Sequence, residues 1–315
     1  MSSADQASVA SETQLELIER ESSSEPRLLR VMNDNLVAAT FIIESSSALE
    51  ILLEPWTVGA RLAHLARSSS VDFLKAAGSQ VNELKEARFE NVTEVVPLAG
   101  ALYYSMAEAF ETVFGEAINR CFIGAKRNLT PTGWMTELSY ENFEAMSPEP
   151  IILIGDTIAT GGTIESIINA TVDNCKNIEA IVIYSIAGGL VGAIRISKLA
   201  EKLEIPIYQF YSNAIFGVEP NGTDMPWLHP GTIVSQQIRE RAESTYGPDL
   251  GRRWCSIWDW GDRAKHPIKH LTELIERCED ELAKDVTEET KSVLEEFLQE
   301  TQDALKKWKG PIQKL

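Results

Sequence analysis

The segment from residue 151 to residue 164 limits the possible folds of this chain more than any other. It begins with four aliphatic residues, 151–154, continues through Gly155 and Asp156, and ends in the Thr/Gly stretch 159–163. A short apolar run followed by glycine is typical of a buried parallel strand. A strand, a glycine loop and a helix in this order predict an α/β architecture.

The loop of this segment has the chemistry of a sugar-phosphate site. Backbone N–H groups of residues 159–163, the hydroxyls of Thr160 and Thr163, and the next helix N-terminus can hold a phosphate. Asp156 can accept hydrogen bonds from ribose hydroxyls. A P-loop would need a lysine after the glycines, and the G-x-G-x-x-G dinucleotide fingerprint is absent from this segment. The alternative is a strand, a turn and a helix with no ligand.

Charge and cysteine usage narrow the class of protein. The chain has 315 residues, 44% of them hydrophobic, and a net charge of −18, which argues against a general nucleic-acid or anionic-membrane binder. A local basic pocket for an anionic ligand is still possible, and its candidates are Lys126 with Arg127, Arg252 with Arg253, and Arg263. The four cysteines are widely spaced, so neither a zinc site nor a disulfide framework is expected. With no long apolar run and no signal-peptide pattern, we expect a soluble cytoplasmic protein.

Strands and helices alternate through the middle of the chain. Strands are predicted at residues 92–97, 119–125, 151–154, 180–186 and 206–212, with helices at 101–114, beyond 163, and at 191–203. This order predicts a parallel sheet flanked by helices, with ligands at the carboxyl ends of the strands. The glycine-rich residues 187–192 are expected to form a tight strand-to-helix turn that borders the pocket.

The two ends of the chain differ from this central pattern. We expect a mobile tail at residues 1–25, an α/β domain at 26–265 and a helical extension at 266–315. Within the domain, residues 28–84 have a helical pattern and residues 126–150 look irregular. In the extension, apolar residues recur at three- and four-residue steps in two stretches. These predict a helical hairpin, with Pro267 in the first turn of one helix and Thr287 capping the other.

Four elements together resemble the type I phosphoribosyltransferases, and most of all the uracil phosphoribosyltransferase branch. These enzymes join 5-phosphoribosyl-1-pyrophosphate (PRPP) to a base. The Ala-Thr-Gly-Gly core at 159–162 resembles the ribose-phosphate loop of that family. Residues 124–127 resemble its arginine-containing segment, and residues 97–100 resemble its pyrophosphate turn. Residues 258–263, Trp-Asp-Trp-Gly-Asp-Arg, are similar to its Gly-Asp-Ala/Phe-Gly-Asp-Arg element.

The resemblance implies a phosphoribosyltransferase that acts on PRPP and uracil or a related ring in nucleotide salvage, with Mg²⁺, as a dimer or higher homo-oligomer. It implies that Asp156, Arg127 and Asp259 carry the reaction and that Asp259 also faces the metal. The implied PRPP-binding residues are Gly155, Asp156, Thr157, Ala159, Thr160, Gly161, Gly162, Thr163, Lys126 and Arg127. Trp258, Asp259 and Trp260 would contact the base, the two indoles by stacking.

Two departures from the family pattern keep other functions open. Leu98 stands where the family has a pyrophosphate-binding arginine, and Gly155 stands where its ribose motif has the first acid. These changes favour a regulator that senses PRPP or a nucleotide without turnover. A transferase for a non-uracil aromatic acceptor is a second alternative. A structural subunit whose C-terminal hairpin binds a partner is a third.

Overall fold

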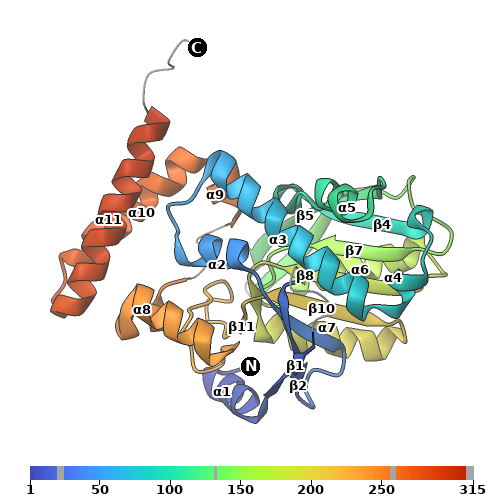
Figure 1. Ribbon diagram of the computed structural model, residues 1–315, viewed down its shortest axis with the longest axis horizontal. Helices are drawn as coiled ribbons and strands as arrows, with labels where there is room; N and C mark the ends of the chain where they lie inside the picture. The colour runs from blue at the N-terminus through green and yellow to red at the C-terminus, as the bar shows by residue number, and fades with distance from the viewer. Residues whose placement is uncertain (20–24, 131–132, 256–259, 310–315) are drawn as a thin grey trace.

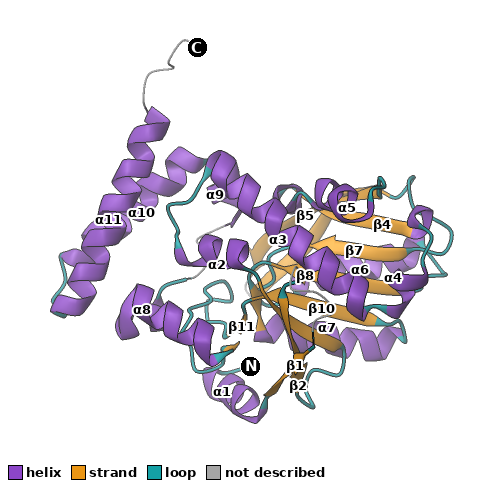
Figure 2. Cartoon of the chain, viewed as in Figure 1, coloured by secondary structure: helices purple, strands orange, loops and turns teal. Residues whose placement is uncertain are grey.

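The computed structural model of the chain describes residues 1–19, 25–130, 133–255 and 260–309. In these residues, helices cover both faces of one large sheet (Figures 1 and 2). Its strands are β1 Gln14–Ile18, β2 Arg27–Met32, β3 Ala39–Glu44, β4 Val92–Leu98, β5 Asn119–Thr130, β6 Gly133–Asn142, β7 Ile151–Gly155, β8 Ala180–Ser185 and β10 Ile207–Ser212. They lie in the order β1-β2-β3-β10-β8-β7-β4-β5-β6. The predicted fold class, a helix-flanked parallel sheet, is confirmed.

The centre of the sheet is parallel and its margins are antiparallel. Within the central series β3-β10-β8-β7-β4-β5, every adjacent pair is parallel. β1–β2, β2–β3 and β5–β6 are antiparallel pairs. A small second sheet contains β9 Gly188–Gly189, β11 Ala214–Phe216 and β12 Ile233–Val234. The carboxyl ends of the central strands therefore lie together at one edge, where parallel sheets bind ligands.

Strand β7 is buried on both faces, which explains its unbroken apolar sequence. Ile152 and Ile154 pack with α6 (Gly162–Asn174) and α7 (Leu190–Leu203), whereas Ile151 and Leu153 belong to the cluster on the opposite face. That opposite cluster includes residues of α2 (Ser46–Leu53), α3 (Gly59–Gln80) and α5 (Met106–Phe114). Alternate side chains of one strand thus support two helical layers, and they fix the position of the loop that follows.

The prediction of a helical pattern from residue 28 is wrong for its first part. β2 and β3 form an antiparallel pair there, and β3 joins the parallel strands through β10. Helices begin only at α2 and continue through α3 and α4 (Asn82–Glu86). The central residues of β3 are buried on both faces, so β3 is a short apolar run, and periodicity alone does not distinguish such a run from a buried helical segment.

Residues 3–18, expected to lie in a mobile tail, form α1 (Ser3–Glu12) and β1. The side-chain amide of Gln6 donates to the carbonyl of Val218 at 2.8 Å and accepts from the Val218 N–H at 2.8 Å. The Gln6 side chain therefore pairs with both backbone groups of Val218, as the backbone of a neighbouring strand would, although Gln6 itself lies in a helix. The sequence around Gln6 is polar and rich in serine, so it did not indicate that this segment packs against a distant part of the chain.

Residues 126–150, predicted to be irregular, instead complete a β-hairpin. β5 continues to Thr130, and β6 returns antiparallel to it, with a register shift between Gly124 and Ala125. β6 forms the margin of the sheet and is partly exposed, so it lacks a run of apolar residues. The hairpin carries Lys126 and Arg127 beyond the sheet edge that bears the glycine loop.

Several further helices complete the molecule. They are η1 Phe89–Asn91, η2 Gly100–Tyr104, α8 Gln236–Arg253, α9 Trp260–Lys265, α10 Pro267–Leu282 and α11 Glu288–Lys309. The predicted C-terminal hairpin is present as α10 and α11, at the left of Figure 1. Pro267 lies in the first turn of α10, and the Thr287 hydroxyl accepts from the Thr290 N–H at 3.2 Å. Both predicted helix starts are confirmed.

Candidate functional site

The loop after β7 is held from behind by the turn that leads into α7. The Ile158 N–H donates to the Ala187 carbonyl at 3.1 Å, and the Gly189 N–H donates to the Ile158 carbonyl at 2.6 Å. The Gly192 N–H donates to the Ala159 carbonyl at 3.0 Å. The predicted tight turn at residues 187–192 therefore forms the support of the loop.

Glycine is required where the loop meets α7. Gly161 has φ +78°, and a Cβ at this position would come within 2.9 Å of the Gly192 Cα. A Cβ at Gly192 would in turn come within 2.8 Å of the Ala159 carbonyl oxygen. The close approach of two backbones explains why glycines occur on both sides of the contact.

Helix α6 begins directly at this loop, with Gly161 as its N-cap residue and no side-chain cap. The N–H groups of the first helical turn have no intrahelical partner and carry the positive end of the helix dipole. Thr160 and Thr163 are partly exposed beside them. The Thr163 hydroxyl lies 3.2 Å from the Thr136 hydroxyl of β6, which ties the loop to the hairpin. Together these groups can hold an anion.

Asp156 is the acid of the site, and it is half-buried at the carboxyl end of β7. Its N–H donates to the Tyr184 carbonyl at 3.0 Å, and its Oδ1 accepts from the Thr157 N–H at 2.8 Å. Burial raises the pKa of Asp156 to about 7, although the Thr157 hydrogen bond and the positive charge of Arg127 lower it. The carboxyl group therefore changes charge near neutral pH.

The structure brings Arg127 to the loop from a different part of the chain. Arg127 and Lys126 lie exposed on β5, and the Arg127 charge is close enough to act on Asp156. Arg127 lies opposite Thr136 in the hairpin register, and Thr136 contacts Thr163. A cation, a carboxylate and a set of helix N–H groups thus surround one region above the strand ends.

Tyr104, which the sequence did not single out, lies beneath this region. Its hydroxyl accepts from the Ile186 N–H at 3.2 Å and lies 3.4 Å from the Thr157 hydroxyl. Its ring lies against Gly155, the position where the family resemblance places a first acid. Tyr104 is completely buried, and burial raises the pKa of its phenol well above the usual range. Only tertiary contacts identify this residue, since it lies in η2, far from the loop in sequence.

Of the predicted element at residues 258–263, the structure describes residues 260–263. Trp258 and Asp259, predicted to contact the base, the ribose or the metal, lie outside the described residues. Trp260 is 4% exposed, donates from Nε1 to the Gly100 carbonyl at 3.1 Å and packs edge-on against Tyr104. This placement leaves little of its indole surface open to a ligand. Gly100 follows the Leu98–Ala99 cis peptide bond, in the turn expected to lie near pyrophosphate.

Arg263, considered for a basic ligand pocket, has a structural role instead. It is fully buried and donates to the carbonyls of Ile51, Glu54 and Thr57 at 2.8, 2.6 and 2.8 Å. These carbonyls lie at and beyond the end of α2, where a cation is favourable. The expectation that Arg263 contributes to a ligand pocket is therefore wrong, because its guanidinium is already used inside the protein.

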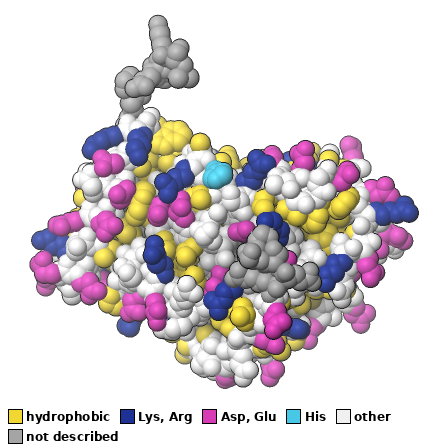
Figure 3. All heavy atoms as spheres, in the orientation of Figure 1, with side chains coloured by type: hydrophobic (Ala, Val, Ile, Leu, Met, Phe, Trp, Pro, Cys, Tyr) yellow, Lys and Arg dark blue, Asp and Glu magenta, His cyan; other side chains and the backbone are white. Residues whose placement is uncertain are grey.

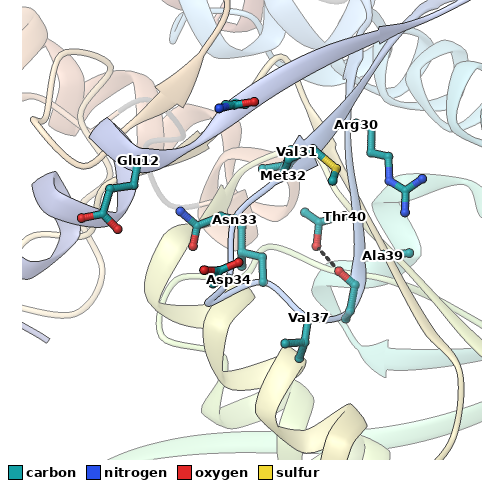
Figure 4. A pocket seen from close by; sticks show the side chains of 12 residues that line it. Glu12, Arg30, Val31, Met32, Asn33, Asp34, Val37, Ala39 and Thr40 are labelled. Atoms are coloured by element: carbon teal, nitrogen blue, oxygen red, sulfur yellow. Dashed lines mark hydrogen bonds between the residues drawn. The ribbon is translucent and has the colours of Figure 1, made fainter.

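A second hollow lies at the opposite edge of the sheet, around the turn between β2 and β3, with a volume of about 420 Å³ (Figure 4). Two of its polar side chains are hydrogen-bonded within the protein. The Asn33 amide donates to Val9 and Thr13, and the Thr40 hydroxyl donates to the Ala38 carbonyl. The loop after β7 is therefore the better candidate for a functional site.

The surface and composition of the described part of the chain add three observations. On the face shown in Figure 3, basic and acidic side chains are interspersed and form no continuous basic patch of the kind that binds nucleic acid. Among the described residues, no group of three or more His, Cys, Asp or Glu side chains could hold a metal. No described helix has both the length and the apolar character needed to cross a membrane.

No protein-family model matches the chain, and no curated protein matches it. Solved structures do. An adenine phosphoribosyltransferase from Trypanosoma brucei, in complex with AMP, pyrophosphate and ribose-5-phosphate, is 12% identical, with a TM-score of 0.35 over 64% of this chain and 95% of that chain. An orotate phosphoribosyltransferase from Francisella tularensis is 10% identical, with a TM-score of 0.31 over 66% and 84%. A hypothetical protein from Neisseria gonorrhoeae with bound ppGpp is 7% identical, with a TM-score of 0.29 over 41% and 68%. Similarity at this level does not decide what the chain does.

Proposed function

We propose that this chain is a phosphoribosyltransferase that transfers the 5-phosphoribosyl group of PRPP to a nucleobase, uracil or a related ring, and releases pyrophosphate. One observation carries the proposal. Asp156 lies half-buried at the carboxyl end of β7, directly before a loop whose N–H groups open α6. An acid for ribose hydroxyls and a cradle for the 5-phosphate are thus adjacent, as a ribose phosphate requires.

Each group has a defined task in the proposed reaction. The N–H groups of residues 159–163 and the hydroxyls of Thr160 and Thr163 hold the 5-phosphate, and Asp156 accepts hydrogen bonds from the ribose hydroxyls. The bond from C1 of the ribose to the pyrophosphate oxygen breaks, and pyrophosphate leaves with the electron pair. A bond from C1 to a base nitrogen forms, and the proton of that nitrogen passes to solvent. Arg127, with Lys126 beside it, offsets the charge of the departing pyrophosphate. The protein needs no nucleophile, because placement and charge stabilisation are sufficient.

Mg²⁺ fits this proposal as a companion of PRPP. Mg²⁺ is commonly bound through one or two protein carboxylates together with substrate phosphates. Asp156 is a carboxylate in the right region, and Asp259 remains a predicted second contact. Bound there, the metal would neutralise pyrophosphate charge.

The accepting ring is the open part of the proposal. The described residues do not complete a base pocket, since Trp258 and Asp259 fall outside them and Trp260 is buried. The homo-oligomeric state also stays a prediction.

The proposal is tested with purified protein, PRPP, Mg²⁺ and a panel of bases. We expect pyrophosphate release with one base, together with a nucleoside monophosphate of matching mass. PRPP and ribose 5-phosphate binding are measured in parallel by calorimetry. If neither ligand binds and no base supports pyrophosphate release, the proposal is wrong.

A PRPP- or nucleotide-sensing regulator is the second candidate. It is favoured by Leu98, which replaces a cationic pyrophosphate contact, and by the space at Gly155 that Tyr104 fills. Such a protein would bind PRPP but release no pyrophosphate with any base. The same two measurements therefore separate a sensor from an enzyme.

A further inference from the structure

Arg195 of α7 lies beside the first turn of α6. A Cβ built on Gly162 would come within 2.9 Å of the Arg195 Nη1, and a Cβ on Gly161 would come within 3.5 Å of its Cδ. The guanidinium is thus next to the residues that open the helix. Helix α7 is itself fixed to the loop by the hydrogen bond from Gly192 to Ala159. The position of Arg195 relative to the loop follows from this backbone contact.

The electrostatics of this placement are unfavourable without an anion. The N-terminus of α6 carries a partial positive charge, and a guanidinium placed against it adds a second positive group. Glu165, in the first turn of α6, compensates only in part, since its Oε2 lies 3.8 Å from the Arg195 Nε and both side chains are more than 40% exposed (43% and 41%). An exposed pair at this distance contributes little.

We propose that Arg195 binds the phosphate held by the loop, and that Glu165 competes with that phosphate for Arg195. The inference rests on the proposed function, which places the 5-phosphate of PRPP at this loop. In the unliganded protein Arg195 pairs with Glu165. When the phosphate binds, the guanidinium turns to a ligand with two negative charges and three oxygen acceptors, which outcompetes a distant carboxylate.

The two residues predict effects of opposite sign, which a merely structural role would not produce. Removing the cation by Arg195→Met is expected to weaken ribose 5-phosphate and PRPP binding about tenfold or more. Glu165→Gln is expected to tighten binding of both, because it removes a repulsive charge and releases Arg195. Arg195→Lys should recover part of the lost affinity. The matched control is Lys202→Met, which removes an exposed cation from the last turn of the same helix.

The experiment is calorimetric titration of the full-length chain and its variants with ribose 5-phosphate and with PRPP, with thermal unfolding to check folding. Weaker binding by Arg195→Met, tighter binding by Glu165→Gln and unchanged binding by Lys202→Met support the inference. If the unaltered protein binds both ligands and Arg195→Met binds them equally well, this inference is wrong and the proposed function stands. If the unaltered protein binds neither ligand, both are wrong.

Discussion

The ring of Tyr104 fills the space next to Gly155: a Cβ at Gly155 would lie 3.1 Å from the Tyr104 Cδ1. The Met106 Cε would lie 3.2 Å from the same Cβ. The packing beneath the loop therefore leaves little space for any side chain at position 155. Asp156 is left as the acid that adjoins the glycine loop, and the Tyr104 hydroxyl supports Thr157 beside it.

An acid introduced at position 155 should destabilise the protein. Gly155→Asp would push a carboxylate into Tyr104 and Met106, and such overpacking typically lowers the free energy of unfolding by about 1–3 kcal/mol. We expect a lower melting temperature and no gain in PRPP affinity. The control is Gly155→Ala, which adds only the Cβ and should lose less stability. Equal stability of Gly155→Asp and the unaltered protein would contradict the packing seen here.

Asp156→Asn is expected to reduce turnover, or PRPP affinity if the protein is a sensor, by about a hundredfold. The amide is of similar size but cannot match the charge-assisted hydrogen bonds of a carboxylate to ribose hydroxyls. Pyrophosphate release and calorimetry measure the effect, and thermal unfolding verifies the fold. Asp173→Asn, an exposed change near the far end of α6, serves as the control. Full activity of Asp156→Asn would remove the ribose-binding assignment.

PRPP binding should depend on pH because the pKa of Asp156 is raised to about 7. Above this value the group is a carboxylate and accepts hydrogen bonds from ribose; below it the proton occupies an acceptor oxygen. The dissociation constant for PRPP should therefore rise as the pH falls from 8 to 6. Titration of PRPP phosphates contributes equally to both proteins, so the difference between the unaltered protein and Asp156→Asn isolates the carboxyl group.

The same raised pKa has an opposite consequence for the unliganded fold. Between the ordinary pKa of 3.8 and about 7, folded Asp156 holds a proton that the unfolded chain has released. The free energy of unfolding therefore falls as the pH rises through this window. Asp156→Asn should show a shallower fall in melting temperature between pH 5 and pH 8. Parallel curves for the two proteins would show that Asp156 titrates in its ordinary range.

Arg263→Lys should destabilise the protein by about 3 kcal/mol, although it conserves the charge. One ammonium group cannot reach the three carbonyls of Ile51, Glu54 and Thr57 that the guanidinium spans, so buried acceptors would lose their partners. Chemical denaturation measures the loss. Arg252→Lys, an exposed change in the last turn of α8, provides the comparison. Loss of PRPP affinity without loss of stability would instead indicate a ligand-binding role.

The C-terminal hairpin is expected to stabilise the body of the protein. Phe297 of α11 is 1% exposed and packs edge-on against Trp56 and Tyr246, at centroid distances of 5.1 and 5.2 Å. Phe297→Ala should lower the free energy of unfolding by about 3–5 kcal/mol. Trp308→Ala, at a side chain that is 43% exposed, should cost less. Similar losses for both variants would contradict this packing.

The regular elements were predictable where burial imposes a local pattern. β7 and β8 are short, mostly apolar runs because both faces of the sheet are covered, and α6 and α7 follow them with helical spacing. β4 and β10 are buried as well and are rich in β-branched and aromatic residues, although they include Glu94 and Gln209. β6 lies at a margin and has no such pattern, so it was missed. β1 was not predicted because it is largely exposed and is held in place by its pairing with β2, which the local sequence does not indicate.

The candidate site divides in the same way. The strand, Asp156, the glycine loop and the helix start could be predicted from the sequence, because these groups are contiguous and each needs particular residue types. Tertiary structure decided what surrounds them: Arg127 and Thr136 come from the hairpin, Arg195 from α7, and Tyr104 fills the space at Gly155. It also placed the Arg263 guanidinium among the buried carbonyls of the segment at the end of α2. The conformation of a contiguous strand, loop and helix depends on neighbouring residues, so it can be predicted from them. The distances between side chains of separate elements depend on how the whole chain packs.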